Sequence, residues 1–182
     1  PTLGALHEGH FSLIKKSMQQ CELTTVSIFL NPTQFSIDED LNKYPKTLDA
    51  DMNALTRLGV DVLFLPNEKE MYQKNPDVNI YETPLFKKLE GKSRPHFFYG
   101  VTTIVAKLFN IIQPTHTFFG EKDAQQLLII KEMIQNMKYP ITLIACATIR
   151  DSNGLALSSR NQYLSITEQK EASIIYNSLM II

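Results

Sequence analysis

The sequence has few of the features that mark several large classes of protein. It has two cysteines among 182 residues, Cys21 and Cys146, which form no Cys-x-x-Cys pair, so we expect free buried thiols rather than a disulfide or a metal site. No apolar run approaches the roughly 18 residues of a membrane-spanning helix, and no signal peptide is visible. These absences favour a soluble, cytoplasmic protein.

An excess of charge of one sign is also missing. The chain has 18 basic and 19 acidic residues, and its net charge is −1. The broad positive field of a duplex DNA or RNA binder is therefore excluded. With 43% hydrophobic residues, the chain can bury one sizeable core, which predicts one domain with room for a small appendage. It starts at Pro1 without an initiator Met and stops inside an apolar helical pattern, so we expect a longer protein.

Short apolar segments alternate with segments of helical periodicity. Strands are predicted at residues 24–30, 60–65, 78–83, 115–119 and 141–149, and helices at residues 9–21, 47–58, 84–90, 101–112, 122–137 and from 165 onward. Strands that alternate with helices predict the α/β class, with a Rossmann-like parallel sheet and helices on both of its faces. His116 is expected in a loop.

Polar clusters follow three of the predicted strands. Asn31–Gln34 follows the first strand, Gly120–Asp123 follows the fourth, and Asp151–Arg160 follows the fifth. Parallel sheets bind ligands beyond the carboxyl ends of their strands. We therefore expect these clusters to converge on one sheet edge, opposite the helix start at His7 and His10.

Each cluster has a plain interpretation beside a functional one. His7 and His10 open a helix, whose N-terminal amides suit phosphates, but two histidines are also ordinary at a helix start. Lys122, Ser158, Ser159 and Arg160 suit phosphate oxygens, or are simply solvated loop residues. Gln34 and Gln126 suit a hydroxylated organic acid, or are surface polar residues. Asp51 is a weak candidate ligand for magnesium.

Four segments together make the sequence similar to a known family. They are Pro1–His10, Ser27–Phe35, Phe119–Gln126 and Gly154–Asn161. In this order they resemble the pantoate–β-alanine ligases, members of the nucleotidylyltransferase superfamily that carries a His-x-Gly-His motif. The resemblance implies a ligase of pantothenate biosynthesis. It would use ATP and Mg²⁺ to join pantoate to β-alanine through a pantoyl adenylate, releasing AMP and pyrophosphate.

The resemblance also implies roles for individual residues. His10, His7, Lys122 and Arg160 would be catalytic. The ATP site would comprise Leu3, Gly4, Ala5, Leu6, His7, Glu8, Gly9, His10, Gly120, Glu121, Lys122, Asp123, Ile149, Leu157, Ser158, Ser159 and Arg160. Thr2, Gln34 and Gln126 would hold pantoate and β-alanine. Residues 1–149 would form the ATP- and pantoate-binding domain, and residues 150–182 the phosphate-binding loop and the start of a small, largely absent C-terminal domain. Family members are typically homodimers.

One segment departs from the family pattern. The family has Arg-Pro-Gly-His-Phe-x-Gly-Val, where this chain has Arg94-Pro95-His96-Phe97-Phe98-Tyr99-Gly100-Val101. The histidine therefore comes one position early, and Phe97 occupies its usual place. The family also has a strand before the position of Pro1.

Two other functions stay open. One is a different nucleotidylyltransferase on the same fold, although a phosphorylated acceptor would require more cations near Gln34 and Gln126. The other is a catalytically incomplete fragment that binds ligands without turnover.

Overall fold

The strands are short and parallel in the computed structural model, which describes residues 1–36, 39–72 and 80–181. Strand β1 (Thr25–Ser27) pairs with β2 (Val62–Phe64), and β3 (His116–Gly120) pairs with β4 (Thr142–Cys146). Parallel strands joined by helices confirm the predicted α/β class. Within the described residues, however, the strands form two separate two-stranded sheets rather than one continuous sheet.

The chain near Thr2 lies beside the edge of β1. The backbone N–H of Thr2 donates to the carbonyl of Ser27 at 2.9 Å, and the N–H of Phe29 donates to the carbonyl of Thr2 at 3.0 Å. The edges of β1 and β3 line a common cavity of about 650 Å³, which separates the two sheets.

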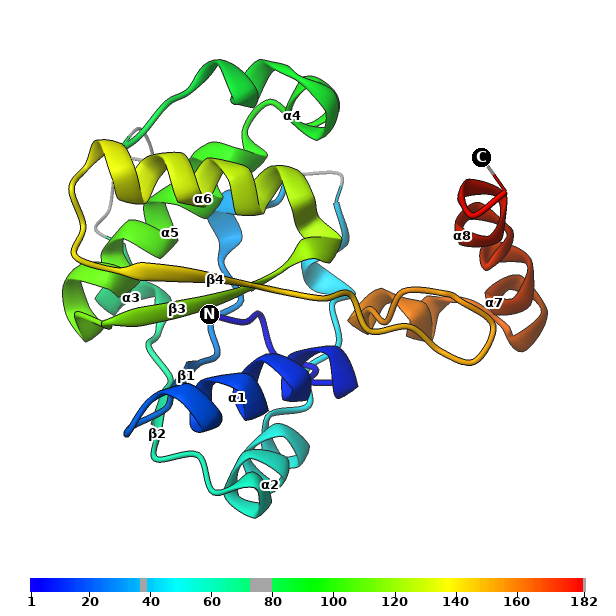
Figure 1. The fold of residues 1–182 in the computed structure, drawn as a ribbon, viewed down its shortest axis with the longest axis horizontal. Coiled ribbons are helices and arrows are strands. Elements are labelled where there is room, and N and C mark those ends of the chain that lie inside the picture. The colour runs from blue at the N-terminus through cyan, green and yellow to red at the C-terminus, as the bar shows by residue number, and fades with distance from the viewer. Residues whose placement is uncertain (37–38, 73–79, 182) are drawn as a thin grey trace.

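Helices cover both faces of β3 and β4 (Figure 1). Helices α5 (Phe97–Ile112) and α6 (Ala124–Asn136) lie on one face, and α1 (Glu8–Gln20) lies on the other, with α2 (Leu48–Leu58) beyond it. The helices on both faces agree with the predicted architecture.

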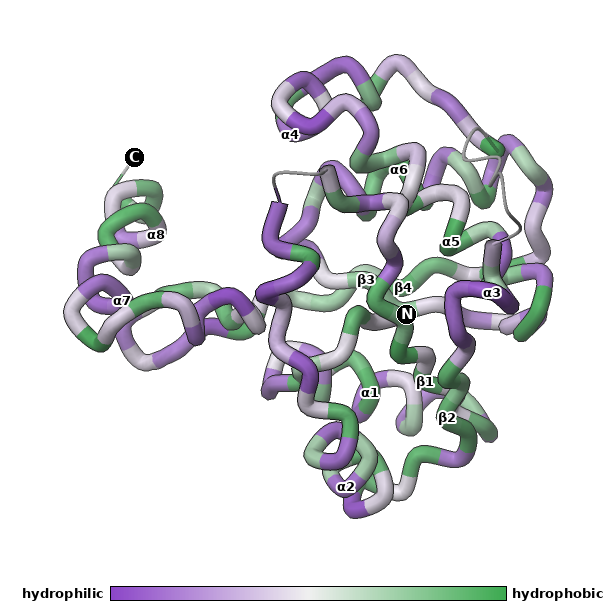
Figure 2. The backbone as a smooth tube through the Cα atoms, turned by 180° about the vertical axis from the view of Figure 1, so that it is seen from behind, coloured by the Kyte–Doolittle hydropathy of each residue, from purple (hydrophilic) through white to green (hydrophobic). Residues whose placement is uncertain are grey.

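The main core lies between α5, α6 and β3. Val105 of α5 packs with Ile130 and Met133 of α6 and with Phe119 of β3. A smaller core joins α1, β1 and α2, and Figure 2 shows hydrophobic segments running through both regions. The two cores hold the carboxyl ends of β1 and β3 near the start of α1.

The boundaries of several elements differ from the prediction. Helix α5 starts at Phe97 rather than at residue 101, and β4 ends at Cys146 rather than at residue 149. His116 begins β3, which agrees with the strand predicted at 115–119, whereas the separate expectation that His116 lies in a loop is wrong. The helix predicted at 84–90 is wrong, since this segment is divided into the 3₁₀ turn η3 (Pro84–Lys87) and the short helix α4 (Leu89–Ser93). The other elements before α7 are α3 (Glu68–Met71) and the 3₁₀ turns η1 (Pro32–Gln34), η2 (Asp40–Asn42), η4 (Glu121–Asp123) and η5 (Ser159–Tyr163). Of the strand predicted at 78–83, residues 78–79 lie outside the described residues, and residues 80–83 form no strand.

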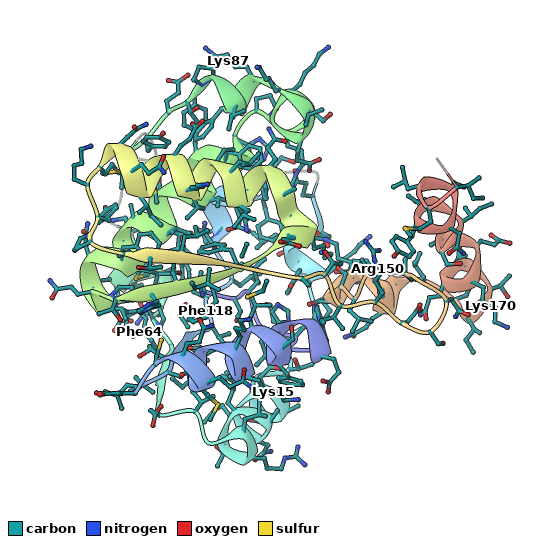
Figure 3. All side chains as sticks on the ribbon, viewed as in Figure 1. Lys15, Phe64, Lys87, Phe118, Arg150 and Lys170 are labelled. Carbon is teal, nitrogen blue, oxygen red and sulfur yellow. The ribbon has the colours of Figure 1, made fainter. Side chains whose placement is uncertain are left out.

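The last two helices stand apart from the rest of the chain. Figure 1 shows α7 (Ile166–Ala172) and α8 (Ile174–Leu179) beyond the segment that follows β4, and Figure 3 places Arg150 at the junction. The helix predicted from residue 165 onward is confirmed, and a capping box starts it, because the Ser165 hydroxyl accepts the N–H of Glu168 at 3.3 Å. The domain boundary after residue 149 stays a prediction. No helix in the described part of the chain is long and apolar enough to span a membrane.

Candidate active site

A cavity of about 590 Å³ lies where the carboxyl ends of β1, β3 and β4 meet the start of α1. All three predicted polar clusters contribute to its wall. The predicted site residues that line it are Thr2, Leu3, His7, Gly9, His10, Gln34, Gly120, Lys122, Asp123, Gln126, Ile149, Leu157, Ser158, Ser159 and Arg160. Those outside its wall are Gly4, Ala5, Leu6, Glu8, Glu121 and Asp51. The fold therefore brings together residues as far apart in the chain as Thr2 and Arg160.

His7 and His10 cap the start of α1 with their side chains. The Nδ1 atom of His7 accepts the N–H of Gly9 at 3.1 Å, and Nδ1 of His10 accepts the N–H of His7 at 3.3 Å. The two rings are 4.1 Å apart. A neutral imidazole that accepts through Nδ1 carries its proton on Nε2. Each ring therefore offers an Nε2–H donor.

The position of the His7 ring explains why a glycine lies between the two histidines. A Cβ atom at this position would lie 2.8 Å from Cε1 and 2.9 Å from Nδ1 of His7. The ring of His7 can fold over the helix start only because that atom is missing. The Gly9 requirement is steric, since its φ is not in the left-handed region.

Both histidines are neutral at physiological pH. The pKa of His10 is lowered to about 3, chiefly by burial, and the neighbouring His7, the amino terminus of the chain and Lys122 lower it further. The pKa of His7 is lowered mainly by burial and then by Lys122. The pair can therefore act as fixed hydrogen-bond donors without adding positive charge of its own.

Two cations reach the same cavity from separate loops. Lys122 lies at the turn between β3 and α6, and its Nζ atom is 3.8 Å from Oδ2 of Asp123. Arg160 comes from η5, which a tight return of the chain brings beside Ile149, since the N–H of Leu157 donates to the Ile149 carbonyl at 2.9 Å. This arrangement suits an anionic ligand.

Asn31 determines which end of the Gln34 amide faces the cavity. Asn31 is completely buried, and its Nδ2 atom donates to Oε1 of Gln34 at 3.1 Å. Its Oδ1 atom accepts the hydroxyls of Thr33 at 2.9 Å and Tyr72 at 2.6 Å, which fixes the Asn31 amide. Since the Gln34 oxygen is held by Asn31, its Nε2 end can donate to a ligand oxygen.

The segment that departs from the family pattern places Phe97, and not His96, in the cavity wall. The Nε2 atom of His96 lies 3.6 Å from Oε1 of Glu39, outside the cavity. The Arg94 guanidinium lies 3.9 Å above the Phe97 ring and is paired with Glu39. Phe97 and Arg94 therefore form this part of the wall, and His96 lies outside it.

Asp51 and Ser159 make contacts that organise the loop before α1. The Asp51 carboxylate accepts the N–H groups of Ala5 and Leu6, both at 2.9 Å, and the Thr47 hydroxyl at 3.2 Å. The Ser159 hydroxyl donates to the Ala5 carbonyl at 3.0 Å. These bonds explain how the loop is held. Among the described residues, no cluster of three His, Cys, Asp or Glu side chains could hold a metal ion.

Sequence reasoning missed several wall residues, including Asn31, Arg94 and Tyr44. Asn31 lay within a polar cluster, and its position directly after a predicted buried strand was the only signal for it. Arg94 begins the segment that was compared with the family pattern but was not assigned to the site, and Tyr44 gave no local signal.

The fold and the cavity together define an α/β protein with a site for an anionic, polar ligand at the carboxyl ends of parallel strands. Comparison with known proteins is more specific. The model of the pantoate-beta-alanine ligase family matches residues 1–182, and the chain belongs to this family.

Individual relatives agree with this result. The chain is 49% identical over 180 residues to pantothenate synthetase of Fervidobacterium nodosum, covering 99% of this chain and 64% of the relative. Among solved structures, the Thermus thermophilus enzyme has a TM-score of 0.95 at 42% identity, covering 99% of this chain and 66% of that one. The Francisella tularensis enzyme, complexed with beta-gamma ATP and beta-alanine, has a TM-score of 0.92 at 44% identity, covering 97% and 68%. The chain thus spans about two thirds of these relatives.

Proposed function

We propose that this chain provides the ATP- and pantoate-binding part of an enzyme that condenses (R)-pantoate with β-alanine. The pantoate carboxylate attacks the α-phosphorus of ATP, giving pantoyl adenylate and pyrophosphate. The β-alanine amine then attacks the acyl carbon and releases AMP. The observation that carries the proposal is one cavity in which neutral histidine donors and two cations meet two glutamines.

The phosphate end of the site comprises His7, His10, Lys122 and Arg160. Adenylyl transfer moves negative charge onto the departing pyrophosphate, and fixed donors stabilise such charge without reorganising. His10 would donate through Nε2–H, and Lys122 would support the pentavalent transition state. The reaction needs no covalent enzyme intermediate, so the protein contributes positioning and charge stabilisation.

The organic end of the site comprises Gln34 and Gln126, with Thr2 and Leu3 beside them and Ile149 bordering the adenine. The Nε2 amide of Gln34 can donate to a pantoate oxygen because Asn31 holds its Oε1 atom. Neutral amides fit a hydroxylated carboxylic acid better than a phosphorylated acceptor, which would require further cations. This favours pantoate over the acceptor of another nucleotidylyltransferase.

Mg²⁺ would accompany ATP, held mainly by phosphate oxygens, as is usual for this ion. The side chains of the site fit this arrangement. The carboxylates of Asp51 and Asp40 already accept hydrogen bonds from the protein, whereas Asp123 lines the cavity.

The proposal also includes a cytoplasmic homodimer. The exposed Val62 and Leu65 at the outer strand β2 support an interface there, which sedimentation measurements would test.

The proposal predicts a pantoate-dependent exchange of pyrophosphate into ATP. Lys122→Ala and His10→Ala should each reduce the exchange rate by roughly 10²–10³-fold, because each removes a donor to the developing charge. Lys131→Ala is the matched control, since Lys131 is exposed on α6 outside the cavity. Exchange at the wild-type rate in either cavity variant would refute the assignment. Calorimetry that detects binding of ATP and pantoate, with no pantothenate formed, would instead favour a chain that binds without turnover.

A further inference from the structure

The guanidinium of Arg160 is held by an aspartate from a distant part of the chain. Asp40 of η2 accepts Nε–H of Arg160 through Oδ2 and Nη2–H through Oδ1, both at 2.8 Å. The two residues are 120 positions apart. Tyr163 donates its hydroxyl to the same Oδ2 atom at 3.0 Å. The roles proposed above for the site residues do not account for this two-point pairing of Asp40 with Arg160.

Asp40 binds only one edge of the Arg160 guanidinium. A guanidinium has five N–H donors in one plane, and Asp40 accepts two of them. Both Nη1 protons and one Nη2 proton remain. Arg160 lines the cavity, and the rings of Tyr44 and Phe35 lie 5.5 and 5.9 Å from its central carbon. The plane of the guanidinium is therefore set by the carboxylate and bordered by two rings.

Asp40 is well suited to hold a cation permanently. Its side chain is only 20% exposed. The hydrogen bond from Arg160 is the largest cause that lowers the pKa of this carboxyl, and Tyr163 lowers it further, so Asp40 stays ionised at neutral pH.

We propose that Asp40 is a positioning residue, which orients Arg160 so that its remaining N–H groups face the departing pyrophosphate. This rests on the proposed function. A free arginine side chain would lose rotamer freedom when it binds a phosphate, and a pre-oriented one loses less. Asp40 thus acts through Arg160 and touches no substrate itself.

Asp40→Asn tests the proposal in pantoate-dependent exchange. The amide can accept only one of the two N–H bonds, so the KM for pyrophosphate should rise about tenfold, as for the loss of one charge-assisted hydrogen bond. The KM for pantoate should stay within about twofold of wild type, which a general structural defect would not produce. In an Arg160→Gln background, adding Asp40→Asn should have no further effect. Tyr163→Phe is the matched control, because it removes a bond to Asp40 but keeps the Arg160 pair.

Several outcomes would overturn the proposal. A lower KM for pyrophosphate in Asp40→Asn would mean that Asp40 competes with the phosphate for Arg160. An unchanged KM for pyrophosphate would mean that Asp40 does not position Arg160. Fully additive effects of Asp40→Asn and Arg160→Gln would mean that Asp40 does not act through Arg160. If Asp40→Asn does not fold, Asp40→Glu, which keeps the charge but shifts the carboxylate, should show the same selective rise. If the wild type shows no exchange, the proposed function fails. Titration calorimetry with inorganic pyrophosphate then tests the positioning alone, with weaker binding to Asp40→Asn in its favour and equal binding against it.

Discussion

His10 is the residue whose protonation depends most on its surroundings. Burial lowers its pKa to about 3, against about 6.5 for an unperturbed histidine. Between these values the unfolded chain binds a proton that the folded chain does not, so the free energy of unfolding falls as the pH drops below 6.5. The slope reaches about 1.4 kcal/mol per pH unit for this group. His10→Asn keeps an oxygen that can accept the His7 N–H but does not titrate, so its stability should decline less steeply.

Urea unfolding at pH 5, 6 and 7 measures this difference for wild type and His10→Asn. Equal slopes in the two proteins would show that His10 is not held neutral in the folded chain. His7, whose pKa is also lowered, keeps its contribution in both and does not affect the comparison.

Single residues divide clearly into those that the sequence could predict and those that it could not. His7, Lys122 and Arg160 were predicted because each belongs to a short polar cluster next to a strand or helix start. Asp40 was missed because its charge looks like ordinary surface charge until Arg160 is folded against it. The Asp40–Arg160 pair joins positions that are 120 residues apart, and no local pattern records it.

Among the elements, the contact between α5 and η1 sets the position of Gln34. A Cβ atom on Gly100 would lie 2.4 Å from the carbonyl oxygen of Thr33 and 2.6 Å from the backbone nitrogen of Gln34. Gly100→Ala must therefore push η1 away from α5, and overpacking of this kind costs about 1–3 kcal/mol of stability. We expect a lower melting temperature and weaker pantoate binding by calorimetry.

Gly120→Ala is the matched control for stability. A Cβ atom there has its nearest neighbour at 4.0 Å, and the backbone of Gly120 is extended, so we expect a melting temperature near that of the wild type. Equal melting temperatures for the two alanine variants would contradict the close packing of α5 on η1.

The same contact explains why the predicted start of α5 was late. Hydrophobic periodicity was clear from residue 101, but Phe98 and Gly100 are buried by segments that come from elsewhere in the chain, and this packing extends the helix to Phe97. The last residues of the predicted strand at 141–149 lie outside β4. Its hydrophobic pattern continues to Ile149, whose carbonyl accepts the N–H of Leu157 as the chain turns back. Periodicity therefore predicted the paired strands and the longer helices, but not the segment from residue 80 to 93, and tertiary contacts determined where the elements end.

Across the whole molecule, burial is distributed unevenly. Helix α5 has ten buried residues, whereas α7 and α8 have none. Ile174, Ile175 and Leu179 of α8 are all at least 64% exposed, and hydrophobic segments recur along α8 in Figure 2. The Arg150 guanidinium, 3.8 Å from the Tyr176 ring, is one contact that ties α8 to the segment after β4.

Segments with few buried contacts open locally at a small cost in free energy, whereas a packed core opens only with global unfolding. We therefore expect the backbone amides of α7 and α8 in this 182-residue chain to exchange with deuterium orders of magnitude faster than those of α5 and α6. Arg150→Ala should accelerate exchange in α8 further and leave α5 unchanged, because it removes a contact that only the outer helices use. Hydrogen exchange followed by mass spectrometry resolves these segments. Protection of α8 equal to that of α5 would mean that the outer helices unfold only together with the core, against their exposure in the structure.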